Sequence, residues 1–397
     1  MPHEFGCKVM IERILQPFIE ELLPEGGIDL KQSRWQEAGR GHPGKDFLNF
    51  IDIRYMRALI ETLYRFSVLT GDTHYHSLAD SQVRFAARHV EEANPIWIKR
   101  GLAGAPTWMI GTALECIGFY HKYNKPEPDL KDAALRLVAM ARARKVTINT
   151  AGVSFGHFPC GYGIASLGAE DSGWTNDLSI TGSGLIWSYE VTQDRSILED
   201  AISYAEYFVQ PWRAGALGDD GYWHAGTWRD DLGSWVIGPL HYSGFESTNI
   251  FGDESSWVFS TFPCIDYLTH LYRYRPDARF LDCCLKAIAW TFEQCQFEDG
   301  AVGLCGRDDK WLGATGYAIS QVVAFNKIAG NCSLPQPIMA NAKRSYQYLR
   351  DRLPKADIEQ HGIEWVNHTS LANPQVNIAW MWLNALLGLL DGHILFG

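Results

Sequence analysis

The sequence lacks the features of a membrane or secreted protein. It contains no run of about 18 apolar residues, which is the length that a membrane-spanning helix requires. Its first residues, Met1-Pro2-His3-Glu4-Phe5, do not form the basic stretch followed by an apolar stretch that marks a secretory signal. These absences predict a cytoplasmic protein without a membrane partner.

Signals for a bound metal, cofactor or nucleic acid are also missing. The nine cysteines are an odd set without a Cys-x-x-Cys pair, which is typical of free thiols in a reducing compartment and not of a zinc site. The sequence has no GxxxxGK[ST], no GxGxxG after a predicted strand, no HExxH and no DDxxD motif. The net charge of −11 comes without a basic stripe, which argues against a nucleic-acid partner. We therefore expect no metal and no cofactor.

What the sequence does have is helical periodicity of two kinds. In one set of segments, apolar residues recur every three or four positions, which predicts amphipathic helices; these segments are about 4–23, 73–93, 129–145, 194–210, 276–296 and 336–352. A second set is apolar nearly all round and must be buried on several sides; it comprises about 50–70, 106–124, 176–192, 255–274, 315–329 and 374–391.

The two kinds of helix alternate strictly, as an internal repeat of about 60 residues. The joint from a buried helix to the next amphipathic one is short, and in three cases an Asp is placed as a helix N-cap: Asp72, Asp194 and Asp277. The opposite joints are long and rich in Gly, Trp and charge, with room for short hairpins; they span about 24–49, 94–105, 146–175, 211–254, 297–314 and 353–373. This pattern predicts an all-α fold with an inner ring, an outer ring and long loops at one rim.

The alternation resembles the (α/α)6 toroids of the six-hairpin glycosidase superfamily, over nearly the whole chain. The resemblance implies one α/α toroid domain over residues 1–397 and a carbohydrate-active enzyme. An isoprenoid-cyclase-type toroid shares the same alternation, and a superhelical repeat array is the structural alternative. The missing DDxxD motif disfavours cyclisation that ionises a diphosphate, but it does not exclude cyclisation that begins with protonation.

Tryptophan marks the rim as the functional region, because loops on a rigid scaffold often carry function. Eleven of the 15 tryptophans fall in the long loops or at the starts of the buried helices, where an indole can stack on the apolar face of a sugar; they are Trp35, Trp97, Trp108, Trp174, Trp212, Trp223, Trp228, Trp235, Trp257, Trp311 and Trp365. The plainer reading is that these indoles pack the long loops together. We predict that some of them, including Trp35, Trp174, Trp223, Trp228 and Trp257, bind substrate.

Carboxylates at the starts of the buried helices supply candidate catalysts. Glycoside hydrolysis usually needs two carboxyl groups that flank the scissile bond. Asp177 follows Trp174-Thr-Asn176, Asp52 precedes Arg54, and Asp253-Glu254 precede Trp257. Acids also favour helix N-termini for reasons of charge alone, so each assignment competes with a structural role. We predict that Asp177 is essential as a base or nucleophile and acts with Asp52, Asp253 or Glu254.

The longest loop adds a second possible chemistry. It contains His224, Arg229, His241 and Tyr242, which could serve as a base and a charge clamp. Other rim residues that we expect to bind substrate are Arg40, Arg54, His157 and Arg307, since arginine suits the carboxylate of an acidic sugar. Lyases with related toroids use Tyr, His, Arg and Asn together to abstract a proton beside a uronate carboxylate. This set of residues therefore keeps a lyase as an alternative function.

We therefore predict a glycoside hydrolase that acts on an oligosaccharide, which could be acidic. The alternatives are a polysaccharide or oligosaccharide lyase that uses His, Tyr and Arg, a non-sugar cyclase-type enzyme, and a non-catalytic binding scaffold. The predicted partner is a small-molecule or oligosaccharide substrate. Substrate identity, stereochemical outcome and oligomeric state do not follow from the sequence.

Overall fold

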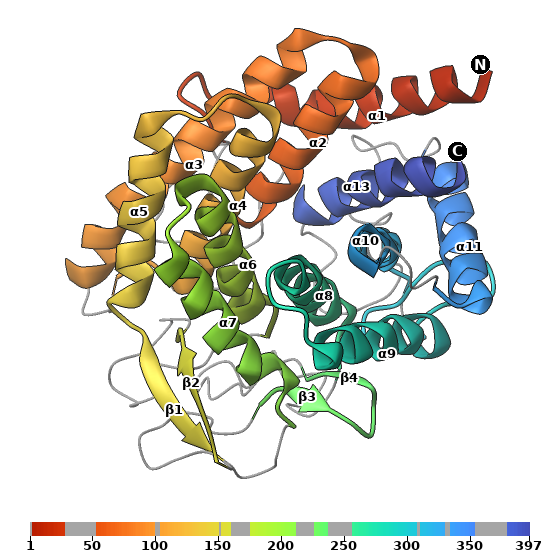
Figure 1. Cartoon of the computed structure of the whole chain (residues 1–397). Helices are drawn as coiled ribbons and strands as arrows, with labels where there is room; N and C mark the ends of the chain where they lie inside the picture. The colour runs from red at the N-terminus through yellow and green to blue at the C-terminus, as the bar shows by residue number, and fades with distance from the viewer. Residues whose placement is uncertain are drawn as a thin grey trace.

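The computed structural model describes most of the chain, and all structural statements below concern its described residues: 2–27, 53–99, 104–150, 152–159, 175–211, 226–236, 256–307, 310–329, 334–353 and 379–397. Over these ranges the chain has twelve helices and two short β-hairpins (Figure 1). The all-α prediction is therefore confirmed.

Six helices form an inner ring. They are α2 (Arg54–Thr70), α4 (Thr107–Tyr123), α6 (Thr175–Thr192), α8 (Val258–Tyr272), α10 (Leu312–Ala329) and α13 (Ala379–Phe396). Each contacts the next in this order, and α13 returns to α2, so the ring is closed and is not an open superhelix. The six correspond to the segments predicted to be apolar nearly all round.

The inner helices run parallel, and close contacts at small residues fix their registers. A side chain at Gly111 of α4 would meet the backbone of Ile180 and Thr181 of α6, and Gly118 faces Trp187 farther along both helices. The pair α10 and α13 packs in the same way, through Gly316 and Gly388. Parallel inner helices place all their N-terminal ends at one rim, which is where the long connections arrive.

The outer ring consists of the amphipathic helices, which pack against the inner ring. They are α1 (Pro2–Glu20), α3 (Thr73–Lys99), α5 (Pro128–Arg142), α7 (Arg195–Val209), α9 (Ala278–Gln294) and α11 (Gln336–Arg352). Figure 1 shows the two sets as concentric layers, with both termini on the same side of the molecule.

Polar contacts tie successive outer helices to one another around the ring. Ion pairs join Glu91 to Arg136, Asp200 to Arg142 and Glu206 to Arg279, which connect α3, α5, α7 and α9 in turn. The Arg13 side chain of α1 donates to the carbonyl of Leu353 just after α11, at 3.0 Å. Exposed ion pairs contribute at most about 1 kcal/mol each, so they align helices whose stability comes from the core.

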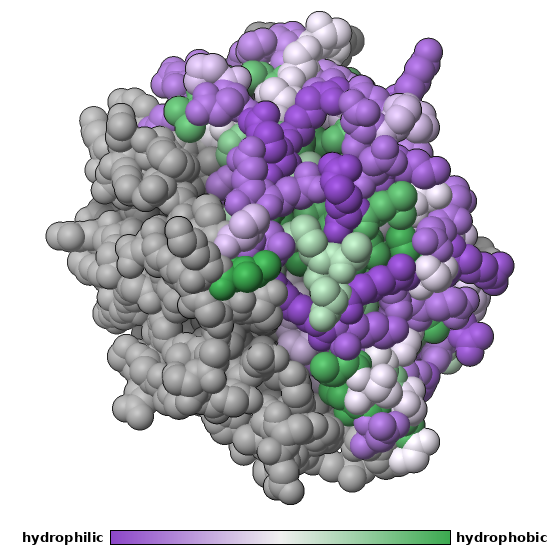
Figure 2. Space-filling view, turned by 90° about the vertical axis from the view of Figure 1, so that its left-hand side faces the viewer, coloured by the Kyte–Doolittle hydropathy of each residue, from purple (hydrophilic) through white to green (hydrophobic). Residues whose placement is uncertain are grey.

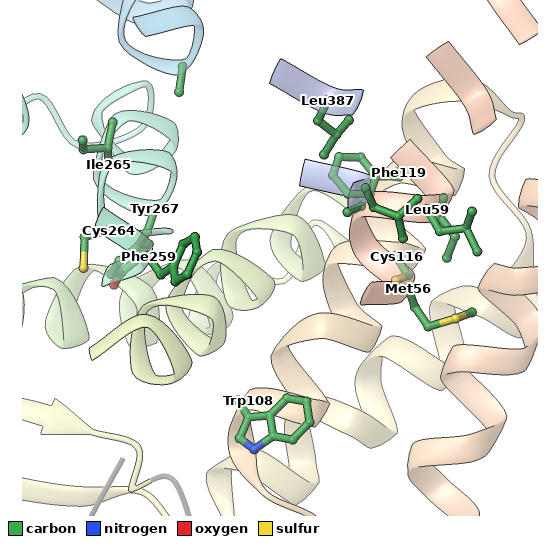
Figure 3. Close-up of a cluster of buried hydrophobic side chains, with 14 of the residues drawn as sticks. Met56, Leu59, Trp108, Cys116, Phe119, Phe259, Cys264, Ile265, Tyr267 and Leu387 are labelled. Carbon is green, nitrogen blue, oxygen red and sulfur yellow. The ribbon is translucent and has the colours of Figure 1, made fainter. Parts of the chain in front are cut away.

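The core lies between the two rings and forms one continuous cluster with residues from every helix. Figure 3 shows part of it, with Met56, Leu59, Cys116 and Phe119 of α2 and α4 on one side and residues of α8 on the other. The residues of α8 in this view are Phe259, Cys264, Ile265 and Tyr267. Nearly the whole length of α4 and α8 is buried, which explains why their sequences show no single apolar face.

The short joints behave as predicted. Asp72, Asp194 and Asp277 each accept a hydrogen bond from a backbone N–H two residues later, at 2.8, 2.9 and 3.0 Å, in the manner of an N-cap. The connection from α5 to α6 begins with a hairpin of β1 (Val146–Thr150) and β2 (Val153–His157). The connection from α7 to α8 contains a second hairpin, β3 (Trp228–Arg229) and β4 (Ser234–Trp235).

Most helix boundaries differ from the prediction by a few residues, and two of these differences have a clear local cause. Helix α3 continues through Pro95 to Lys99, so Trp97 lies in a helix and not in a long loop. Pro95 does not end it, because a proline costs a helix one hydrogen bond and packing can compensate for that. Helix α5 ends at Arg142, three residues early, because the chain enters β1 after a turn.

Several expected features of the surface and the thiols can also be checked. Cys116, Cys264, Cys283, Cys284 and Cys295 are free and buried, and burial raises the pKa of each thiol. None of the helices over the described ranges has the length and apolar character needed to span a bilayer. The described part of the face in Figure 2 is mostly hydrophilic, with small hydrophobic patches.

Candidate functional site

Asp177 lies where the sequence placed it, in the first turn of α6 at the rim end of the inner ring. Its side chain is 3% exposed, and the Asn176 amide lies 3.1 Å from Oδ1 and donates to it. A carboxylate in the first turn of a helix is stabilised by the helix dipole. The position therefore combines burial, a fixed orientation and proximity to the long connections.

The tryptophans whose side chains the structure describes are not open at the rim. Trp108, Trp228, Trp235, Trp257 and Trp311, all members of the predicted set of eleven, are between 0% and 8% exposed. Trp228 packs edge-on against Trp235 and donates its indole N–H to Asp230 at 2.6 Å. Trp257 packs against Phe259. Burial disfavours stacking of a sugar on these five indoles, for which packing is the role that the structure supports.

Three further described candidates also have partners within the chain. His157, at the end of β2, is fully buried against Tyr204 and Tyr207 of α7. Arg229 forms a two-point pair with Asp231, and Arg307 donates to the carbonyl of Glu293 at 2.6 Å. These contacts disfavour the predicted contact between His157 and substrate and reduce the case for a uronate bound by Arg229 or Arg307.

The remaining candidates lie outside the described residues, and their roles stay predictions. They are Asp52, Asp253, Glu254, His224, His241, Trp35, Arg40, Trp174, Trp223, Tyr242 and the side chain of Arg54. We also predict that the connections 146–175 and 211–254 together wall the substrate cleft, and most of these two segments lies in the same part of the chain. The structure therefore describes the helical base of the predicted site and not its loops.

At this base the structure brings together a polar set that the sequence analysis missed. It takes one side chain from each inner helix, and we call it the axial cluster: Arg57 of α2, Glu115 of α4, Ser183 of α6, Asp266 of α8, Tyr317 of α10 and Asn384 of α13. The feature of the sequence that could have revealed this cluster is an isolated acidic residue within an apolar helix: Glu115 and Asp266 are the only acids of α4 and α8.

The ion pairs of the axial cluster cross the ring. The Arg57 Nη2 lies 2.6 Å from Asp266 Oδ2, and its Nε lies 3.3 Å from Glu115 Oε2. Since α2 and α8 stand three places apart in a ring of six, the Arg57–Asp266 pair spans the toroid axis. The guanidinium also lies near the rings of Phe119 and Phe262, at 5.7 and 5.3 Å from their centroids.

Burial and charge set the protonation of this cluster. Burial alone would lower the pKa of Arg57, but Glu115 and Asp266 raise it above its usual value. Burial raises the pKa of Glu115 to about 7, although Arg57 opposes the shift. The cluster therefore places the Arg57–Asp266 ion pair beside a carboxyl that is partly protonated near neutral pH.

A second polar group lies beyond the axial cluster, between the neighbouring helices α10, α13 and α2. Arg65 of α2 pairs with Asp391 of α13 at 2.7 Å, and the Ser320 hydroxyl of α10 donates to the same carboxylate at 2.6 Å. Phe119 packs against Trp187 in the same region. Asp391 is buried, whereas the side chain of Asp266 is 27% exposed.

The raised pKa of Glu115 predicts a specific pH dependence of stability. Between pH 4.5 and 7 the folded chain binds a proton at Glu115 that the unfolded chain has lost, so this stabilising contribution is complete at low pH and disappears as pH rises through 7. We expect the free energy of unfolding of the wild type, relative to Glu115→Gln, to fall by at most about 3 kcal/mol between pH 5 and pH 8. Urea unfolding of both proteins across this range measures it. A difference that does not change with pH contradicts the assignment.

One hydrolase-like pattern in the sequence has the wrong structural context. Residues 152–156 read Gly-Val-Ser-Phe-Gly, which matches the Gly-x-Ser-x-Gly pattern of nucleophilic serines. That motif requires a sharp turn from a strand into a helix. Here Ser154 lies in strand β2 opposite Asn149 and is exposed to solvent. The match therefore does not indicate a serine nucleophile.

Comparison with known proteins gives relatives in structure only. No protein-family profile and no curated protein matches the sequence. The α-1,6-mannanase GH76A of Salegentibacter sp. HEL1_6 aligns over 98% of this chain and 99% of its own, with a TM-score of 0.59 and 14% identity. A variant of the same mannanase has been solved in complex with α-1,6-mannotriose.

Two other solved structures extend this likeness to different activities. The unsaturated glucuronyl hydrolase of Bacillus sp. GL1 aligns over 96% of this chain and 94% of its own, with a TM-score of 0.56 and 13% identity. A D-mannose isomerase aligns over 96% and 97%, with a TM-score of 0.54 and 9% identity. At such identities the likeness concerns the fold: the chain has the (α/α)6 toroid fold of six-hairpin glycosidases and related enzymes.

Proposed function

We propose that the protein is a glycoside hydrolase that cleaves an oligosaccharide at the rim of the toroid, with residues 1–397 as one domain. The observation that carries this proposal is the position of Asp177, a buried carboxylate in the first turn of an inner helix, at the end where the long connections arrive. Two solved structures of the same fold are glycoside hydrolases with different substrates, which supports the chemical class and not the substrate.

Asp177 acts in this proposal as the base or nucleophile, since the helix start favours its charged form. Its partner acid comes from the rim, from Asp52 or from Asp253 and Glu254. Glu115 lies deeper in the toroid, beside Ser183, which is six residues after Asp177 on α6, or about 9 Å along the helix axis.

A panel of defined oligosaccharides, neutral and uronate-containing, tests the proposal. We expect the purified protein to release a new reducing end from at least one member, with incorporation of one oxygen from water. A product with a conjugated double bond and no oxygen from water would show a lyase instead. If no member is cleaved while a sugar still binds, the chain is a binding scaffold, and if no sugar binds, the case for a cyclase-type or other non-sugar enzyme increases.

A further inference from the structure

We propose that Asn176 is a positioning residue, whose side-chain amide holds the Asp177 carboxylate in one orientation and in its charged form. The inference rests on the proposed function and deepens it, because it assigns a second residue of α6 to the same reaction. It depends on contacts within the first turn of α6 and not on the identity of the substrate.

The first argument is the hydrogen bond between the two side chains. The amide nitrogen of Asn176 donates to Asp177 Oδ1 at 3.1 Å, and both residues lie in the first turn of α6. A donor beside a carboxylate favours its charged form and limits its rotation. The side chain of Asp177 is only 3% exposed, so water can replace this donor only in part.

The second argument is that Asn176 has no other evident role. Among the described residues, its buried Oδ1 finds no hydrogen-bond partner, so the bond to Asp177 is the one that its side chain makes. A buried amide that served packing alone would normally satisfy both of its ends. Helix α6 begins at Thr175, so Asn176 lies inside the helix, where asparagine is a weak helix former.

The third argument is that the backbone below this pair is anchored to α8. The Ser179 hydroxyl donates to the Asn176 carbonyl at 2.9 Å and lies within hydrogen-bond reach of the Cys264 thiol. Gly182 packs so closely against Tyr267 of α8 that an added Cβ would lie 2.5 Å from the ring. The first turn of α6 is therefore fixed, and the orientation of the carboxylate depends on side-chain contacts such as that of Asn176.

The pH dependence of kcat/KM tests the role in catalysis. A base or nucleophile must be charged, so the rate should rise with pH as Asp177 ionises. Asn176→Ala removes the donor, and the acidic limb of the profile should move to higher pH by about one unit. Asn176→Asp keeps the size of the side chain but places a like charge beside Asp177, so its limb should move further. A purely structural role would lower the rate without moving the limb.

Asn326→Ala is the matched control. Asn326 is half-buried near the opposite end of another inner helix, α10, where its amide nitrogen lies 3.9 Å from the Met339 sulfur. We expect its pH profile to match that of the wild type. If Asn176→Ala also matched the wild type, the proposal would be overturned, and hydrolysis by Asp177 would remain in place.

Urea unfolding tests the same contact without a substrate. The hydrogen bond favours the charged carboxylate, so the stability that it adds is present where Asp177 is charged and is lost as the pH falls and the carboxylate is protonated. At pH 7, Asn176→Ala should raise the equilibrium constant for unfolding about tenfold. This effect should shrink as the pH is lowered to about 3.

The same substitution in an Asp177→Asn background completes the test, because its cost there should not depend on pH. The comparison cancels the titration of groups on helices that pack against α6, which include Glu115 of α4 and Cys264 and Asp266 of α8. A cost of Asn176→Ala that is equal at both pH values in the wild-type background overturns the proposal, whether or not any oligosaccharide is cleaved. A pH-dependent cost in a protein that cleaves no oligosaccharide would keep the contact and refute the hydrolase.

Discussion

Asp177→Asn should lose about 10²- to 10⁴-fold in turnover on whichever oligosaccharide the wild type cleaves. The change keeps the size of the side chain, but it replaces one accepting oxygen with a donating amide nitrogen and removes the negative charge that a base or nucleophile needs. The fold should survive, because the lost interaction with the helix dipole is worth only about 0.3 to 1 kcal/mol. Initial rates and thermal unfolding of both proteins measure the two effects separately.

Asp282→Asn is a suitable control for this substitution. It makes the same chemical change on the outer helix α9, where the exposed carboxylate pairs with Lys286 at 2.7 Å. We expect its turnover to match that of the wild type. A folded Asp177→Asn protein with near-normal turnover would refute the catalytic assignment. Inactive His224→Ala or His241→Ala proteins beside an active Asp177→Asn protein would support the lyase instead.

The helices were predictable because each kind carries a local pattern. The amphipathic segment at 194–210 became α7 (Arg195–Val209), and the segment at 336–352 was predicted to the residue. The alternation with buried helices then left few ways to close the chain, because an apolar helix must be covered on several sides. Helix boundaries were harder to predict where a residue can either end a helix or lie within one, as Pro95 does in α3.

The candidate site was predictable only in part. Asp177 could be placed because it begins an apolar helix, and its position there does not depend on distant contacts. The axial cluster could not be assembled from sequence. Arg57, Glu115 and Asp266 lie on three helices, and only ring closure brings α2 opposite α8. A charged residue inside an apolar helix indicates a partner but does not identify it.

The tryptophans show the opposite limit. Their place in loops suggested open aromatic surfaces, but loop position does not determine whether an indole faces solvent. Trp228 and Trp235 lie on neighbouring strands of one hairpin and cover each other, and Trp235 also donates to the carbonyl of Phe208 at 2.7 Å. An indole has a large apolar area, so it is buried wherever a neighbour can cover it.

Gly316→Ala should cost the fold about 3 kcal/mol or more, although alanine is the better helix former by about 1 kcal/mol. A Cβ at Gly316 would lie 2.1 Å from the carbonyl oxygen of Asn384, and Gly388 of α13 faces Gly316 just as closely. These contacts are between backbones, so no side chain can move aside and the two helices must separate. Asn384 itself and Tyr317, which follows Gly316, belong to the axial cluster, so the contacts of that cluster should be disturbed as well.

Gly71→Ala is the control for this substitution. Gly71 has a φ of 74° at the end of α2, and a Cβ there would meet nothing within 4 Å. Alanine should therefore cost only the backbone strain of the left-handed region, about 1 to 2 kcal/mol, and should leave the axial cluster undisturbed. Urea unfolding of the two variants compares a steric cost with a conformational one. Equal losses of stability would mean that α10 and α13 separate easily, and that their close packing does not hold the axial cluster in place.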